Sequence, residues 1–191
     1  MTIPNLITIG RVFMAPLIVW LITADHALAA FWVFCLAGLS DAVDGFLARQ
    51  LNLHTALGTY LDPLADKALL VSIYVALSVL GELPVWVTIL VVSRDLSIIG
   101  AVVLSWMLGQ PMEMRPLAIS KVNTVAQIAL AAVVLGDLAF AFDLAAVRTV
   151  LVYLVGANTI VSAGFYLVDW TRHMGAAGPG VADGPGGNQP R

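Results

Sequence analysis

Six long apolar segments, separated by short breaks, decide what this chain can fold into. Each is close to the length of roughly 20 residues that a helix needs to cross a bilayer. The breaks carry charges or turn-forming residues, as in Gly81-Glu82-Leu83-Pro84. Because 60% of the residues are hydrophobic and only 11% are charged, the composition disfavours a soluble globular fold. We therefore predict an all-α integral membrane protein with six transmembrane helices, at residues 7–24, 28–48, 58–80, 85–107, 122–142 and 147–169.

The distribution of Arg and Lys predicts how these helices are oriented. In a six-span topology most basic residues outside the spans fall on one side, and only Arg148 lies near the other. Because cytoplasmic loops are rich in Arg and Lys, both termini are expected in the cytoplasm. From about Gly175 the composition shifts to Gly, Pro, Ala and Asn. The chain is therefore expected to form a membrane domain over residues 1–174 and a disordered tail over 175–191.

Four aspartates lie where the second apolar segment ends and the third begins. Asp41 and Asp44 are three residues apart, and Asp62 and Asp66 are four apart, so each pair shares one face of its helix. An isolated carboxylate inside a membrane is costly or takes up a proton, so a positive charge is expected among the four. Hard oxygen ligands suit one or two Mg²⁺ or Mn²⁺ ions. The same aspartates could instead line the cation pathway of a transporter.

Other segments contribute polar residues at a similar depth. Asn5, Thr8 and Arg11 lie on the first helix, and Arg94 and Asp95 come from the middle of the fourth. The fifth helix opens with further polar residues between 120 and 127. Independent segments therefore place polar side chains in one cavity that is open to the cytosol.

The stretch from Asp41 to Asp66 resembles the signature of the CDP-alcohol phosphotransferases. That signature is Asp-x-x-Asp-Gly-x-x-Ala-Arg, eight residues, then Gly-x-x-x-Asp-x-x-x-Asp. The resemblance implies a six-helix membrane fold, usually a homodimer, in which an alcohol displaces CMP from a CDP-linked substrate with the help of a divalent metal. A transporter has no need of the fixed Gly, Ala and Arg positions. Every position is matched, by Asp41, Asp44, Gly45, Ala48, Arg49, Gly58, Asp62 and Asp66.

The resemblance also implies roles for individual residues. Asp41, Asp44, Asp62 and Asp66 would be metal ligands, and Asp66 would also be the candidate base for the attacking hydroxyl. A glycine lets a nucleotide approach the helix backbone closely, and the planar guanidinium of an arginine can hold a phosphate. The residues expected to contact the CDP-lipid are Asn5, Thr8, Gly45, Ala48, Arg49 and Gly58.

Within the family, the chain most resembles the CMP-forming cardiolipin synthases, which implies CDP-diacylglycerol and phosphatidylglycerol as substrates. The acceptor phosphate would be bound by Arg94, Arg115 and Lys121. The alternative is a phosphatidylglycerophosphate synthase, which uses glycerol 3-phosphate and usually has a lysine where Asn123 stands. A small dianion benefits from several cations, so the loss of one lysine favours the lipid acceptor.

The expected location is a bacterial inner membrane, with the active site on the cytoplasmic side. A mitochondrial import signal is rich in Arg and Ser, and the opening of this sequence is not. The few charges lie within or next to the apolar segments, and no nucleic-acid partner is expected.

Overall fold

The computed structural model contains six helices and no strand in the part of the chain that it describes, residues 3–51, 56–107 and 118–176. Side chains are described for 10–43, 65–100, 107, 120–166 and 168. The predicted all-α fold is confirmed. Ala176, the last residue of the sixth helix, lies just inside the stretch expected to be a tail, and 177–191 lie outside the described residues. The helices are α1 (Ile3–Thr23), α2 (Ala27–Leu51), α3 (Ala56–Val79), α4 (Val85–Met107), α5 (Ala118–Phe140) and α6 (Ala145–Ala176).

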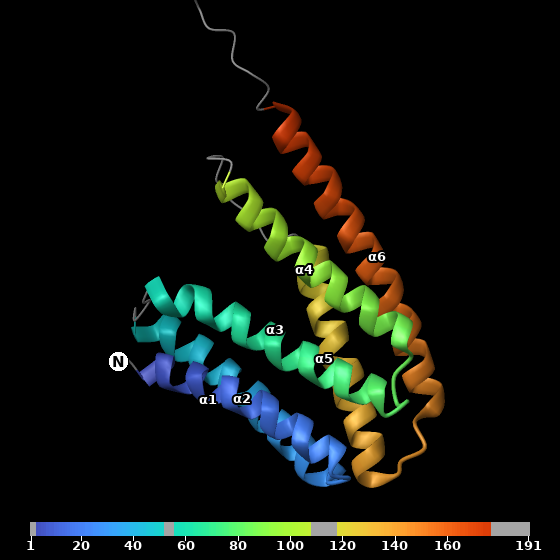
Figure 1. The fold of residues 1–191 in the computed structure, drawn as a ribbon. Coiled ribbons are helices and arrows are strands. Elements are labelled where there is room, and N and C mark those ends of the chain that lie inside the picture. The colour runs from blue at the N-terminus through green and yellow to red at the C-terminus, as the bar shows by residue number, and fades with distance from the viewer. Residues whose placement is uncertain (1–2, 52–55, 108–117, 177–191) are drawn as a thin grey trace, which may run out of the picture.

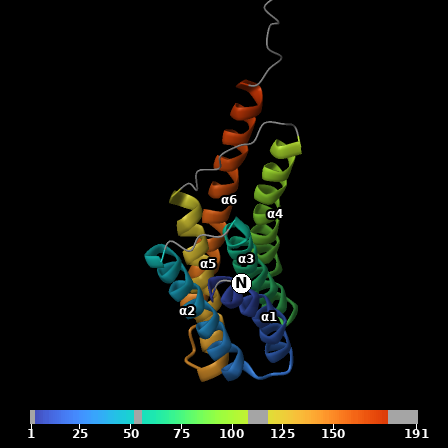
Figure 2. The ribbon, with the colours of Figure 1, turned by 90° about the vertical axis from the view of Figure 1, so that its left-hand side faces the viewer.

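The six helices pack in an order that differs from their order in the chain. Helix α1 packs against both α2 and α3, and α5 packs against α2, α3 and α6. Helix α4 packs against α3 and α6. The start of α1, the end of α2 and the start of α3 lie at one end of the molecule, where α4 and α6 diverge from them and extend further (Figures 1 and 2). Among the described residues α2 and α3 make no direct contact, and both α1 and α5 pack against the two of them.

Tight caps reverse the chain at the other end of the molecule. Gly81 follows α3 with a φ of 79°, a left-handed conformation that glycine adopts without steric cost. The amide of Gly81 donates to the carbonyl of Ser78 at 3.1 Å, and that of Glu82 donates to Leu77 at 2.8 Å. This pair of bonds is a Schellman motif, which satisfies carbonyls that the helix end would leave unpaired. Helix α4 then begins directly after Pro84 and runs back along the bundle.

The packed interior combines an apolar core with polar side chains, while the exterior is apolar. Ile18, Ile73 and Leu130 are fully buried, and large apolar side chains such as Phe13 and Val79 are 71% and 78% exposed. Soluble monomers rarely expose extensive apolar surface, so this exterior suits contact with lipid. The buried polar side chains are Arg11, Thr88, Arg94, Asp95, Asn123, Gln127, Thr159 and Ser162.

Two helical segments in the described chain are long and apolar enough to cross a membrane, namely Ser120–Phe140 and Ala145–Tyr166. Two further apolar segments, Gly10–Thr23 and Ala27–Val43, are shorter. The described residues of α3 and α4 carry Asp66, Lys67, Arg94 and Asp95, which lower their hydropathy. Two candidate spans are thus found by length and composition, and the six-span topology stays a prediction.

Candidate catalytic site

Arg11 joins two of the four predicted metal ligands. Its Nη1 lies 2.9 Å from Oδ1 of Asp41 on α2 and 2.5 Å from Oδ1 of Asp66 on α3. The arginine side chain is 1% exposed, whereas the two aspartate side chains are 49% and 40% exposed. A guanidinium is a suitable partner because it presents several donors in one plane and keeps its charge. Helices α1, α2 and α3 therefore meet at an ionic centre that includes Arg11, Asp41 and Asp66 among the described side chains and remains accessible from outside.

The distances at this centre show whether Asp41 and Asp66 could bind one divalent ion. Both carboxylate oxygens contact the same nitrogen, so they are at most about 5.4 Å apart. An ion such as Mg²⁺ binds oxygens at about 2.1 Å, so an ion that holds both would bring them to within about 4 Å. Small side-chain rotations would be sufficient for that. Two half-exposed carboxylates that already converge on one cation thus form a donor set that fits Mg²⁺ or Mn²⁺.

The other two predicted ligands, Asp44 and Asp62, lie on the described backbone of α2 and α3. Asp44 lies one turn beyond Asp41 on α2, and Asp62 lies one turn before Asp66 on α3, so the helix repeat puts each on the same face as its partner. Among the described side chains no group of three or more His, Cys, Asp or Glu could hold a metal. Arg115 lies outside the described residues, and the side chains of Asn5, Thr8, Asp44, Gly45, Ala48, Arg49, Gly58 and Asp62 lie outside the described set.

A second ionic network lies next to the first. Oδ1 of Asp95 on α4 accepts from Nζ of Lys67 on α3 at 2.7 Å and from Nη1 of Arg94 at 2.6 Å. Lys67 directly follows Asp66, so the two networks are linked through α3. The lysine side chain is 29% exposed, whereas Asp95 is buried. Sequence reasoning assigned neither Lys67 nor Asp95 a binding or catalytic role, although their positions beside Asp66 and Arg94 were the available signal.

Arg94, which was predicted to contact the acceptor phosphate, is 4% exposed and tied to three helices. Its Nη2 donates to Ser120 Oγ on α5 at 2.6 Å and to Ser162 Oγ on α6 at 3.0 Å. The guanidinium also lies over the ring of Tyr166, 5.5 Å from its centroid. These contacts connect α4 with α5 and α6 around Asp95, and the acceptor role of Arg94 stays a prediction. Lys121, the neighbour of Ser120, is exposed.

Position 123 lies inside the bundle. Oδ1 of Asn123 accepts from Thr159 Oγ1 on α6 at 3.1 Å, and the side chain is fully buried. One turn further along α5, Gln127 is 2% exposed, and its backbone carbonyl accepts from the Tyr74 hydroxyl at 3.1 Å. The amide nitrogens of Asn123 and Gln127 have no hydrogen-bond partner within the described part of the chain. These two hydrogen bonds connect α3 and α6 to α5 inside the bundle.

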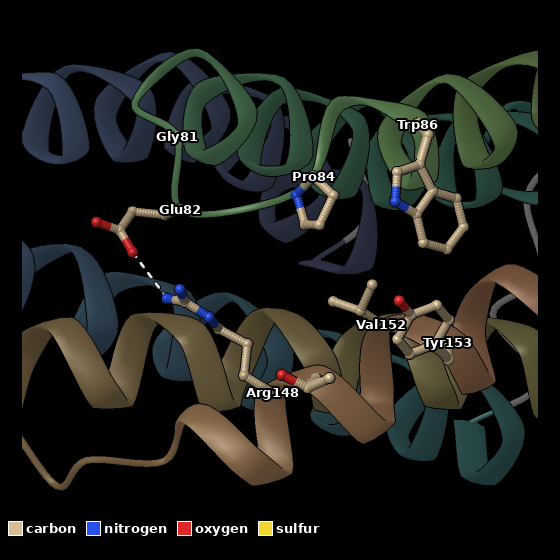
Figure 3. Close-up of a pocket in the computed structure, with 8 residues that line it drawn as sticks. Gly81, Glu82, Pro84, Trp86, Arg148, Val152 and Tyr153 are labelled. Atoms are coloured by element: carbon tan, nitrogen blue, oxygen red, sulfur yellow. Dashed lines mark hydrogen bonds and ion pairs between the residues drawn. The ribbon is translucent and has the colours of Figure 1, made fainter.

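The described chain also contains cavities at the opposite end of the bundle, away from these networks. One of about 250 Å³ is lined by Glu82, Trp86, Arg148 and Tyr153 (Figure 3). Across it, Nη1 of Arg148 on α6 contacts Oε2 of Glu82 at 2.8 Å, and the indole of Trp86 lies 5.9 Å from the ring of Tyr153. A second cavity, of about 310 Å³, lies between the ends of α1, α3 and α5. Neither is lined by a residue predicted to act in catalysis, so we place the candidate site at the aspartates.

The amino-acid sequence is similar to those of named enzymes. A CMP-forming cardiolipin synthase/mitochondrial hydrolase fusion protein of Schizosaccharomyces pombe is 34% identical over 87% of this chain and 31% of its own length. The chloroplastic CDP-diacylglycerol–glycerol-3-phosphate 3-phosphatidyltransferase 1 of Oryza sativa is 37% identical over 85% of this chain and 55% of its own. A human CMP-forming cardiolipin synthase is 40% identical over 69% of this chain and 49% of its own.

The chain thus spans between about a third and about half of the length of these relatives. The profile of the CDP-alcohol phosphatidyltransferases matches residues 1–164, which include all six helix starts and both ionic networks. The chain belongs to the CDP-alcohol phosphatidyltransferase family.

Proposed function

We propose that this protein is a cardiolipin synthase that transfers the phosphatidyl group of CDP-diacylglycerol to a hydroxyl of phosphatidylglycerol and releases CMP. The observation that carries the proposal is the convergence of Asp41 and Asp66, the first and last aspartates of the family motif, on the buried Arg11. Relatives named cardiolipin synthase support the choice of acceptor. The plant relative named for glycerol 3-phosphate supports a phosphatidylglycerophosphate synthase as the second candidate.

In this proposal the four aspartates hold one or two Mg²⁺ or Mn²⁺ ions. When bound, the metal would stabilise negative charge on the phosphoryl oxygens and on departing CMP. Asp66 would accept the proton of the attacking hydroxyl, and its side chain is exposed enough, at 40%, for an alcohol to reach it. Geometry has to supply most of the activation, because a carboxylate with an ordinary pKa is a weak base toward an alcohol.

Cations around the aspartates would bind the two lipid headgroups. Arg49 would hold a phosphate of the CDP-lipid, beside Gly45, Ala48 and Gly58, with Asn5 and Thr8 contacting the nucleotide. Lys121 is exposed at the start of α5, where it can meet an acceptor phosphate, and Arg94 and Arg115 would assist. Lys67 adds a partly exposed cation held beside Asp66 by Asp95. Charge-assisted contacts of this kind are the strong ones in phosphate recognition.

The proposal also includes the membrane setting. All six helices would span a bacterial inner membrane with both termini in the cytoplasm, and two copies would form a homodimer. The apolar exterior of the described helices supports contact with lipid. The excess of Arg and Lys at the end where α1 starts and α2 ends supports a cytoplasmic location for the aspartates.

One assay tests the activity. Purified protein in lipid–detergent micelles receives CDP-diacylglycerol and Mg²⁺ or Mn²⁺, and CMP release is measured with phosphatidylglycerol, with glycerol 3-phosphate, or with no acceptor. We expect release with phosphatidylglycerol alone, and none after the metal is removed with EDTA. Release with glycerol 3-phosphate but not with phosphatidylglycerol would favour the second candidate. No release with either acceptor would refute both and leave a transporter to be considered.

A further inference from the structure

Arg11 contacts two aspartates that come from two different helices. Its guanidinium is buried, and a single nitrogen contacts one carboxylate on α2 and another on α3. Those two helices make no direct contact among the described residues. The carboxylates would repel each other at this separation unless a positive charge lay between them. Arg11 provides that charge, and it therefore connects α2 and α3 through α1.

A divalent ion would bind the same two carboxylates. Metal ligands have to be ionised, and each carboxylate that contacts Arg11 through Oδ1 has a second oxygen that an ion could also coordinate. An ion and the guanidinium both carry positive charge, so they repel each other when both contact this pair of carboxylates. Binding of the ion is therefore expected to weaken the contacts at 2.9 and 2.5 Å.

We propose that Arg11 is a built-in counter-ion of the metal site: it holds Asp41 and Asp66 together when no metal is bound and competes with the metal for their negative charge. This inference rests on the proposed function, because it requires that the aspartates bind a divalent ion. It assigns Arg11 a positioning role. The arginine keeps the two carboxylates close together at the cost of part of the metal affinity.

The variant Arg11→Met tests the idea, because methionine is unbranched and apolar like the stem of arginine and lacks the charge. Two opposite effects are expected. The metal-free protein should unfold at a lower temperature, because the two carboxylates then face each other without the positive charge of Arg11. Its affinity for Mn²⁺ should rise on the order of tenfold, which is typical of coupling between competing ligands. Arg11→Lys keeps the charge and should stay close to the wild type in both measurements.

The matched control is Arg148→Met, which removes an arginine from the ion pair between α6 and Glu82 in the loop that joins α3 to α4 (Figure 3). This change should lower stability equally with and without Mn²⁺ and should leave the Mn²⁺ affinity unchanged. Affinity is measured by electron paramagnetic resonance of free Mn²⁺ during titration of the EDTA-treated full chain in micelles. Thermal unfolding is followed by circular dichroism in EDTA and in Mn²⁺.

The outcomes separate this inference from the proposed function. If the wild type binds Mn²⁺ and releases CMP, but Arg11→Met binds Mn²⁺ equally or more weakly, the counter-ion role is refuted and the enzyme remains. If the wild type binds no Mn²⁺, both fail. If Arg11→Met does not fold even with Mn²⁺, Arg11→Gln and Arg11→Lys are titrated instead. The inference then requires tighter binding by the glutamine variant than by the lysine variant, and equal binding overturns it.

Discussion

Replacing Asp95 with asparagine would remove the charge on which the second ionic network is built. Asp95 is 5% exposed, and its Oδ1 contacts Lys67 on α3 and Arg94 on the same helix. Breaking a buried ion pair by removing one partner costs about 3–5 kcal/mol. Lys67 is 29% exposed, so water screens it and its share is about 0–1 kcal/mol. Arg94 keeps its hydrogen bonds to two serines, so the expected loss of unfolding free energy is at the lower end of that range, about 3 kcal/mol in total.

A loss of that size changes the unfolding equilibrium constant by roughly a hundredfold. It can be measured by titrating the protein in mixed micelles with sodium dodecyl sulfate and following helicity by circular dichroism. The matched control is Glu82→Gln, which breaks the Glu82–Arg148 pair, where both side chains are about a third exposed. That change should cost less than about 1 kcal/mol. If Asp95→Asn costs no more than Glu82→Gln, the network does not stabilise the contact between α3 and α4.

Two further changes test the packing and the chemistry. A Cβ at Gly156 would lie 2.5 Å from Cζ3 and 2.8 Å from Cη2 of Trp86, so Gly156→Ala should displace the indole and cost about 1–3 kcal/mol, measured by the same titration. Gly164→Ala on the same helix has open space and should be close to neutral; equal losses for both variants would contradict the packing argument. Asp66→Asn should abolish CMP release while membrane insertion and helicity stay unchanged. Appreciable turnover by this variant would remove Asp66 from the role of base.

The sequence predicted the helices well because each apolar run is long and bounded by turn residues or charges. The predicted segments 58–80 and 85–107 differ from α3 and α4 by no more than a few residues. The sequence also placed Asp41 and Asp66 in one cluster of four aspartates, because each lies on the acidic face of its segment and a short loop joins the two segments. The contact of Arg11 with both was not foreseen. It depends on α1 packing against α2 and α3 at once, and the periodicity of one segment does not reveal its neighbours.

The structure changes the argument about which acceptor the enzyme uses. In the sequence, the absence of a lysine at position 123 favoured phosphatidylglycerol over glycerol 3-phosphate. Asn123 is fully buried and hydrogen-bonded to Thr159, so the side chain of a lysine at this position would extend into the bundle. It would lie on the same face of α5 as Ser120, which accepts a hydrogen bond from Arg94. Such a lysine would add positive charge close to a guanidinium that Asp95 already neutralises.

An additional cation at that depth requires an additional anion, because buried charges are kept only when they are paired. A small dianion that enters the bundle would supply it, whereas the phosphodiester of a lipid stays near the membrane surface with its acyl chains in the bilayer. The neutral Asn123 therefore suits an acceptor that is recognised further out, by Lys121, which is exposed, and by Lys67, which is partly so. The proposal of phosphatidylglycerol as the acceptor thus rests on where the charge at position 123 would lie as well as on how many cations the site contains.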